Sequence, residues 1–157
     1  IEQITGTYRP STYTNAHMER GHIEEPIARM MYEDQTFCEV KNGGFFHDGD
    51  LGASPDGLVD DNGVIEIKSA IPSIHFGRVK RDALDPTYKW QCYQNLKISG
   101  REWIDFISYC ADFPMGKRLF VHRTYAKDCA EQFGQIDTRI NEFMVEIQSA
   151  KKLISSI

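Results

Sequence analysis

The spacing of apolar side chains predicts three helical regions. The first runs from about residue 15 to 33, where Ile23, Ile27, Met30 and Met31 recur at spacings of three and four. Pro26 lies inside it and predicts either a bend or a new helix that starts just before the proline. Two helices follow from Ser73 to about Leu84 and from Asp85 to about Ser99. The last region starts at Asp128, and we expect it to pack across the sheet through Phe133, Ile136, Ile140, Phe143 and Ile147.

Extended segments alternate with these helices and predict a mixed sheet. They cover residues 36–41, 51–59, 64–68, 102–110 and 118–123, with a further short strand that opens at Phe45 and Phe46. Residues 60–63, Asp-Asp-Asn-Gly, predict a tight turn between two of them, because Asn-Gly tolerates positive φ. Residues 1–14 show no apolar period and are expected to be an irregular lead-in. We therefore predict one α/β domain over residues 1–157, with a central mixed β-sheet flanked by helices.

Composition narrows the class of protein. No run approaches the roughly 20 apolar residues of a membrane helix, and the first residues lack a secretory pattern, so we expect an intracellular, cytoplasmic protein. The four cysteines show no paired spacing, which favours reduced, mostly buried thiols over a zinc site or disulfides.

The net charge of −5 hides an asymmetry along the chain. Residues 1–66 hold 4 Lys/Arg against 13 Asp/Glu, whereas residues 67–127 hold 11 against 5. An acidic part that binds cations and a basic part that binds phosphates would suit a metal-dependent nuclease, although two solvated faces would give the same counts. Within the basic part, one candidate phosphate-contacting stripe, which is equally consistent with a solvated face, consists of Arg78, Lys80, Arg81 and Lys89.

The predicted hairpin between residues 51 and 68 carries the candidate chemistry. Side chains alternate along a strand, so Glu66 and Lys68 share one face while Ile65 and Ile67 point to the other. The turn brings Asp56 within a residue or two of Glu66 on the neighbouring strand. Two such close carboxylates repel each other unless one is protonated or a cation lies between them. Magnesium, which prefers carboxylate and carbonyl oxygens, fits this pattern, but an exposed Glu–Lys strand pair is the alternative.

Several motifs carry a family resemblance over residues 16–150. Residues 54–57, Ser-Pro-Asp-Gly, followed by 66–68, Glu-Ile-Lys, match the PD-(D/E)xK nuclease signature. Residues 20–29, 52–58, 99–103, Gln91 and the strand that ends at Tyr109 resemble further motifs of the phage λ-exonuclease/YqaJ family of viral recombinases. The resemblance implies the PD-(D/E)xK nuclease fold.

The resemblance also implies a set of catalytic residues. Asp56, Glu66, the backbone carbonyl of Ile67 and Glu25 would ligate two Mg²⁺ ions, with Mn²⁺ as an alternative. Lys68 would orient or deprotonate the attacking water, and Gln91 would lie beside the site. The adjacent Glu24 leaves the choice of Glu25 open by one residue, although Glu25 falls on the helical face of Ala28 and Tyr32. The family's arginine-plus-serine motif for a terminal phosphate has no match, and Tyr93 replaces a second common glutamine.

The activity implied by the resemblance is 5′→3′ exonucleolytic hydrolysis of linear double-stranded DNA, with release of 5′-mononucleotides. The expected assembly is a homotrimer, and the expected partner in phage-type recombination is a single-strand annealing protein in an infected or prophage-bearing bacterial cell. Two alternatives remain. One is an endonuclease or junction resolvase of the same fold, which would cut closed circular DNA, and the other is a non-catalytic DNA- or partner-binding module.

Overall fold

A computed structural model describes residues 2–7, 15–49 and 51–156, which form an α/β domain around a five-stranded mixed sheet. The strand order is β1-β4-β5-β6-β7, in which only β5 and β6 are parallel neighbours. Their bounds are Val40–Asn42 for β1, Gly57–Val59 for β4, Gly63–Ser69 for β5, Trp103–Tyr109 for β6 and Leu119–Tyr125 for β7. A separate antiparallel pair is made by β2, Phe46–Asp48, and β3, Leu51–Ala53. The predicted fold class is therefore confirmed.

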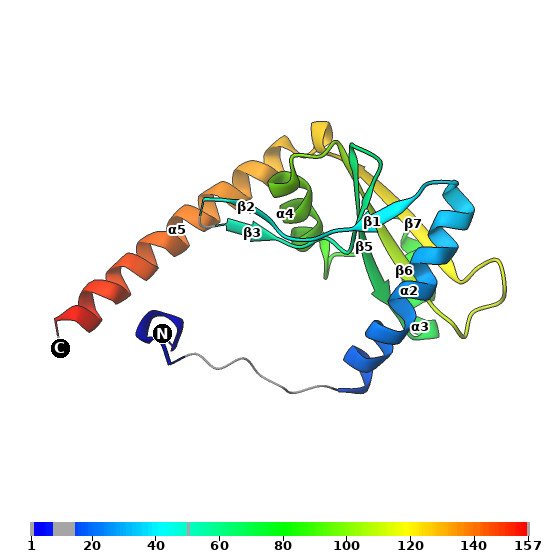
Figure 1. The fold of residues 1–157 in the computed structure, drawn as a ribbon, viewed down its shortest axis with the longest axis horizontal. Coiled ribbons are helices and arrows are strands. Elements are labelled where there is room, and N and C mark those ends of the chain that lie inside the picture. The colour runs from blue at the N-terminus through cyan, green and yellow to red at the C-terminus, as the bar shows by residue number, and fades with distance from the viewer. Residues whose placement is uncertain (1, 8–14, 50, 157) are drawn as a thin grey trace.

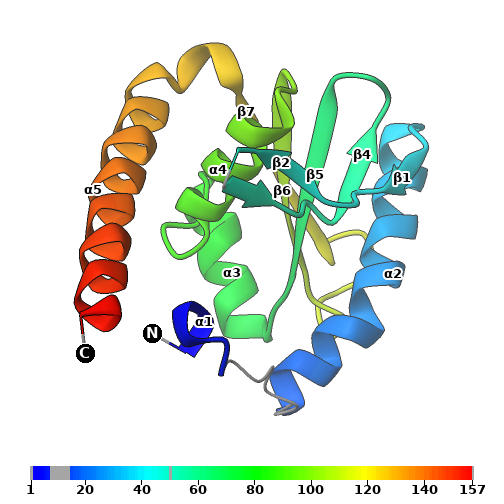
Figure 2. The same cartoon turned by 60° about the vertical axis from the view of Figure 1, so that its left-hand side comes forward.

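Helices cover both faces of the sheet (Figures 1 and 2). One face carries α2, Ala16–Thr36, and the other carries α3, Pro72–Arg81, and α4, Lys89–Ser99. The remaining helical elements are α1, Glu2–Thr5, the short 3₁₀ helix η1, Ala126–Asp128, and α5, Ala130–Ser155. Among the described residues, no helix is long and apolar enough to span a membrane.

Two apolar clusters explain why the central strands are almost wholly buried. On one face, Ala28 and Tyr32 of α2 pack on Ile65 and Ile67 of β5. On the other face, the second cluster consists of Val64, Ile104, Phe106, Cys92, Leu96 and Cys129. Because α2 and α4 cover opposite faces, β5 and β6 are buried on both sides. Consequently Glu66, which is fully buried in β5, lies inside the protein and is not part of an exposed strand pair.

The helix α2 is longer and turned differently from the prediction. It is a single helix that contains Pro26, and its buried face is formed by Ala28 and Tyr32. Of the stripe that predicted the helix, Ile23, Ile27 and Met30 are 69%, 40% and 55% exposed, and only Met31 packs against the core. Periodicity identifies which residues share a helix face, but the small Ala28 and the large Tyr32 decide which face approaches the sheet.

The helix α5 does not pack across the sheet as predicted. Its first turns contact α4, where Ile136 is buried and Phe133 packs against the core. Further along, Phe143 is 55% exposed, and the helix runs away from the rest of the domain (Figure 1). An amphipathic pattern shows that a helix has an apolar side, but it does not show what lies opposite that side.

Several predicted boundaries are wrong. The segment 36–41 is not one strand, because α2 continues to Thr36 and β1 starts only at Val40. The segment 51–59 is divided into β3 and β4, and the helix expected to start at Asp85 starts at Lys89. The lead-in contains the helix α1, while residues 8–14 lie outside the described residues. The helix α3 starts at Pro72 without a side-chain cap, so Ser73 does not cap it.

The turn between β4 and β5 forms where predicted, but Gly63 does not supply the positive φ that the sequence suggested. Positive φ occurs at Asp60, at 46°, and not at Asn62 or Gly63. Gly63 is instead required by packing, since a Cβ at this position would lie 2.2 Å from the Trp103 ring. The cysteines agree with the prediction, because all four are free and three of them are buried.

Candidate active site

The hairpin places Asp56 beside the middle of β5. In the antiparallel pairing, Gly57 lies opposite Ile65, and the Asp56 N–H donates to the Ile65 carbonyl at 3.0 Å. The Asp56 carboxylate accepts a hydrogen bond of 2.6 Å from the Ile67 N–H at Oδ2. The strand β4 therefore begins just after Asp56, and the carboxylate takes the ladder position that a backbone carbonyl would otherwise fill.

The direction of the Ile67 carbonyl follows from the same hydrogen bond. In an extended strand, the N–H and C=O of one residue point to the same edge. The N–H of Ile67 points to Asp56, so its carbonyl also points to the open edge of β5 beyond the start of β4. An oxygen ligand at this edge is thus available beside a carboxylate.

The Glu66 carboxylate is buried and has three polar partners. Lys68 Nζ lies 2.5 Å from Oε1, which confirms that the two side chains share a face of β5. From α4, the Gln91 amide donates to Oε1 at 2.6 Å and the Asn95 amide donates to Oε2 at 2.8 Å. Gln91 therefore lies beside the site as expected, whereas Asn95 was missed. The signal available in the sequence is that Gln91 and Asn95 lie four residues apart on one face of a helix.

The two adjacent glutamates of α2 have different surroundings. Glu24 accepts a hydrogen bond from the Ser69 hydroxyl, which also accepts one from Arg20 Nε at 3.0 Å. Glu25, in contrast, lies close enough to Asp56 and Lys68 for their charges to shift its pKa. The structure thus brings Glu25, and not Glu24, toward the carboxylates of the hairpin.

Burial raises the pKa of all three carboxylates, and the charge of Asp56 adds to the shift at Glu66 and Glu25. Burial, followed by the charge of Asp56, raises the pKa of Glu66 to about 7 although Lys68 opposes the shift. Burial raises the pKa of Asp56 above its ordinary value, and burial followed by the charge of Asp56 does the same for Glu25. Burial lowers the pKa of Lys68, but Glu66 and Asp56 outweigh it, so the ammonium ion is stabilised. One lysine therefore does not balance the negative charge of this cluster.

A divalent cation suits the chemistry of these donors. The carboxylates of Asp56, Glu66 and Glu25, together with the Ile67 carbonyl, are hard oxygen ligands of the kind that Mg²⁺ prefers. Burial raises the pKa of all three carboxylates, and a nearby cation would favour their ionised forms. Among the described residues, no group of three or more His, Cys, Asp or Glu side chains is already arranged so that it could hold a metal ion. The donor types suit the metal that the sequence predicts, whereas their side chains do not yet converge on one point.

Aromatic and basic residues support Lys68 from its other side. Its Nζ lies 5.1 Å from the centre of the Tyr88 ring, and Tyr88 stacks on Phe106 of β6. Arg78 is 5% exposed and donates to Asp85 at 2.6 Å and to the Ser108 hydroxyl at 3.1 Å. The guanidinium of Arg78 thus bonds to residues inside the protein. Arg78 is therefore not a surface member of the candidate phosphate-contacting stripe.

The comparisons with known proteins identify a family and related exonucleases. The YqaJ-like viral recombinase domain matches residues 1–102. The alkaline exonuclease LHK-Exo of Laribacter hongkongensis is 32% identical, with a TM-score of 0.86 over 98% of this chain and 77% of that chain. The same protein in complex with dAMP gives 33% identity and the same TM-score of 0.86.

A phage-related exonuclease of Haemophilus somnus 129PT shares 14% identity with a TM-score of 0.73, over 99% of this chain and 78% of that chain, which supports the fold alone. No curated protein matches the chain. The hairpin motif, the mixed sheet of the PD-(D/E)xK type and the match over residues 1–102 together show that the chain belongs to the YqaJ-like viral recombinase domain family.

Proposed function

We propose that this protein is a metal-dependent DNA exonuclease that degrades linear double-stranded DNA in the 5′→3′ direction and releases 5′-mononucleotides. The observation that carries the proposal is the cluster of Asp56, Glu66 and Glu25 around the edge of β5, with Lys68 paired to Glu66. The 32% identity to an alkaline exonuclease over nearly the whole chain supports the same reaction class.

Two divalent ions, Mg²⁺ or Mn²⁺, would be held by Asp56, Glu66, the Ile67 carbonyl and Glu25. When bound, they would lower the pKa of a water and offset the charge of the phosphodiester. The chain's own residues have separate tasks. Lys68 contacts Glu66 and the Tyr88 ring, and its ammonium group would orient the attacking water and offset the charge of the phosphate.

The amides of Gln91 and Asn95 fix the carboxylate of Glu66 by donating to both of its oxygens. Hydrogen bonds from neighbouring groups to a metal-ligating side chain orient that side chain before the ion binds. The Ile67 N–H does the same for Asp56. The two carboxylates are therefore held by donors from α4 and β5, and catalysis by positioning requires groups that are held in this way.

The proposal extends to assembly and partners. We infer a homotrimer that encircles duplex DNA and supplies 3′ overhangs to a single-strand annealing protein, on the basis of the family resemblance. The crystal structure of the related LHK-Exo in complex with dAMP supports a DNA substrate for this protein. Size-exclusion chromatography with light scattering tests the trimer directly.

A hydrolysis assay on end-labelled linear duplex tests the reaction. We expect Mg²⁺-dependent release of mononucleotides, complete loss in excess EDTA, and a loss of at least about a thousandfold in Asp56→Ala and in Lys68→Ala. Asp61→Asn is the matched control, since Asp61 is exposed in the turn of the same hairpin. Unchanged activity in either site variant, or in EDTA, would refute the assignment.

The polarity and the alternative activity are separated by substrate form. Linear duplexes labelled at the 5′ or the 3′ end, with 5′-phosphate or 5′-hydroxyl termini, distinguish the direction of digestion. Closed circular duplex should remain intact. Efficient cutting of the circle would identify an endonuclease or junction resolvase on the same fold, and tight binding without cleavage would identify a non-catalytic module.

A further inference from the structure

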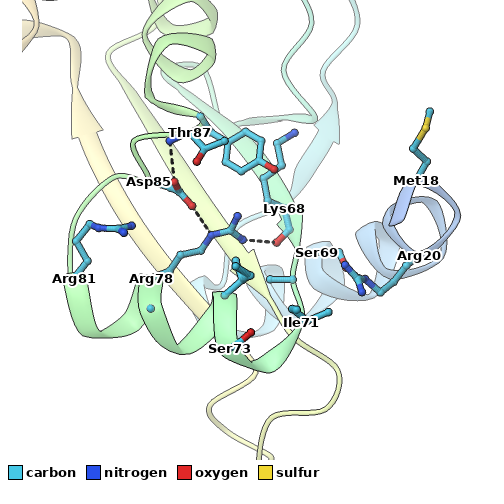
Figure 3. A pocket seen from close by; sticks show the side chains of 14 residues that line it. Met18, Arg20, Lys68, Ser69, Ile71, Ser73, Arg78, Arg81, Asp85 and Thr87 are labelled. Carbon is cyan, nitrogen blue, oxygen red and sulfur yellow. Dashed lines mark hydrogen bonds and ion pairs between the residues drawn. The ribbon is translucent and has the colours of Figure 1, made fainter. Parts of the chain in front are cut away.

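A pocket of about 680 Å³ opens directly beside Lys68, between α3 and the first part of α2 (Figure 3). It lies on the side of Lys68 where β5 ends at Ser69 and the chain turns into α3. Its volume is within the range of small-ligand sites, which is roughly 300–1,000 Å³. The candidate active site uses Lys68 and the Tyr88 ring beside it, and it leaves the α2 and α3 residues of the pocket without a role.

The lining is strongly cationic. It includes Lys68, Arg20, Arg78 and Arg81 and a single carboxylate, Asp85. Burial raises the pKa of Asp85, but the Thr87 N–H and Arg78 outweigh it, so Asp85 is ionised and its charge is neutralised from inside the protein. The pocket therefore offers positive charge to a ligand, and an anion is the chemical class that it fits.

Arg81 supplies the guanidinium that is available to such an anion. It belongs to the last turn of α3, and in Figure 3 it extends toward Arg78 and Asp85. It has no hydrogen bond or ion pair with any residue that the structure describes, whereas Arg78 is taken up by Asp85 and Ser108. A free planar guanidinium suits a phosphate, because it donates two parallel hydrogen bonds.

The preceding residue on α3 provides a contrast. Lys80 is exposed like Arg81, but it does not line the pocket. Both residues have the same formal charge and lie next to each other in the sequence. An effect of general surface charge would be equal at the two positions, whereas a pocket-specific effect would occur at Arg81 alone.

Gly77 is a second, independent feature of the pocket. It lies inside α3, where glycine is a poor helix former, and it lines the cavity. A Cβ built on it meets no atom within 4 Å, so the space in front of it is open. The missing side chain therefore leaves this part of the cavity open.

We propose that this pocket binds a backbone phosphate of the DNA strand under attack, one that neighbours the phosphodiester placed at Lys68. The inference rests on the proposed nuclease function and adds a substrate subsite to it. A DNA strand carries a phosphate at every nucleotide, so a strand with one phosphate at the carboxylate cluster presents the next one to the adjoining surface. Arg81 would fix the register of the strand without reading its sequence.

The first test compares Arg81→Gln with Lys80→Gln on long linear duplex in the presence of Mg²⁺. We expect Arg81→Gln to raise KM roughly tenfold with little change in kcat, and to reduce the slope of log affinity against log salt by about one. Lys80→Gln should change KM by less than about twofold. Equal effects in the two variants would overturn the pocket assignment.

The second test identifies which phosphate is bound, using duplexes with one neutral methylphosphonate linkage at successive positions. At one position next to the cleaved bond, the substitution should raise KM in the wild-type protein but not in Arg81→Gln. The opposite outcome is that the methylphosphonate changes KM equally in wild type and Arg81→Gln at every position, while dAMP or inorganic phosphate inhibits Arg81→Gln more weakly than wild type. This outcome would show that the pocket binds a free mononucleotide or phosphate and not the DNA strand.

The third test blocks the pocket from Gly77. Gly77→Glu places a carboxylate in the open space, and Gly77→Gln is the matched neutral control of the same size. We expect Gly77→Glu to raise KM at least tenfold more than Gly77→Gln, while melting curves show that both variants fold. Equal KM values in these two variants would contradict the proposal.

The nuclease function and the pocket fail in different ways. If the wild-type protein shows no hydrolysis, the proposed function fails, and binding of fluorescent duplex in Ca²⁺ still tests the pocket. Weaker binding by Arg81→Gln than by Lys80→Gln supports the pocket in that case, and equal binding rejects it. If hydrolysis is normal and the two variants behave alike, only the pocket fails.

Discussion

Two buried carboxylates on adjacent strands of the same sheet show what separates a supporting charge from a reactive one. Asp105 of β6 is 1% exposed and accepts two hydrogen bonds of 2.7 Å from Arg123, together with one of 2.7 Å from the Tyr32 hydroxyl. Glu66 of β5 is also fully buried, but it shares its single lysine with Asp56 and Glu25.

The difference lies in compensation and not in burial. A bidentate guanidinium balances Asp105 completely, and Arg123 also stacks 3.6 Å from the centre of the Trp103 ring. At Glu66, burial, followed by the charge of Asp56, raises the pKa although Lys68 opposes the shift. A buried acid is therefore informative about function only when its surroundings leave it short of a cation.

The largest expected effect on stability comes from breaking the compensated pair. Asp105→Ala leaves the Arg123 guanidinium and the Tyr32 hydroxyl without their partner, so we expect a loss of roughly 3 kcal/mol in the free energy of unfolding. The value is at the low end of the usual range because Arg123 is 38% exposed and can be partly hydrated. Urea denaturation of Asp105→Ala and of wild type measures it. A loss below about 1 kcal/mol would remove the contrast between the two sites.

The pH dependence of the metal-free protein should sharpen the comparison. The pKa of Glu66 is raised from 4.5 to about 7, so the folded state holds a proton that the unfolded state has released between these two values. Stability from Glu66 is therefore complete below about pH 4.5 and is lost as the pH rises through 7, up to about 3 kcal/mol. Thermal melts in EDTA from pH 4.5 to 8 measure this loss.

Glu66→Gln is the control for that profile, because an amide has no proton to release. Its melting temperature should fall less with pH than that of wild type, and at pH 8 it should equal or exceed the wild-type value. The contrary result is a wild-type melting temperature that does not fall between pH 4.5 and 7, or a fall that Glu66→Gln reproduces. Either result would show that the charge of Glu66 is balanced as well as the charge of Asp105.

The smallest effect separates the two adjacent glutamates of α2. We expect Glu25→Gln to weaken Mg²⁺ binding roughly tenfold, which lowers the Mg²⁺-induced gain in stability by about 1.4 kcal/mol at saturating Mg²⁺. Glu24→Gln should leave that gain unchanged, since Glu24 bonds to Ser69. Melting temperatures with and without Mg²⁺ measure the gain. A larger loss in Glu24→Gln would exchange the roles of the two residues.

The sequence by itself determined the elements of the site that depend on local periodicity. Alternation along the strand placed Glu66 and Lys68 on one face, and the tight turn placed Asp56 beside them, because both follow from the geometry of two consecutive strands. The mixed α/β fold was predictable for the same reason, since alternating helical and extended periods leave few architectures.

Only the tertiary structure decided the contacts between segments that are distant in the sequence. It showed that α2 approaches the sheet through Ala28 and Tyr32, that Asn95 reaches Glu66, and that Arg81 faces a pocket while Lys80 does not. Periodicity defines the faces of an element, but packing against other elements selects among those faces. Charge works in the same way, because a count of acids and bases cannot show which carboxylate lacks a partner.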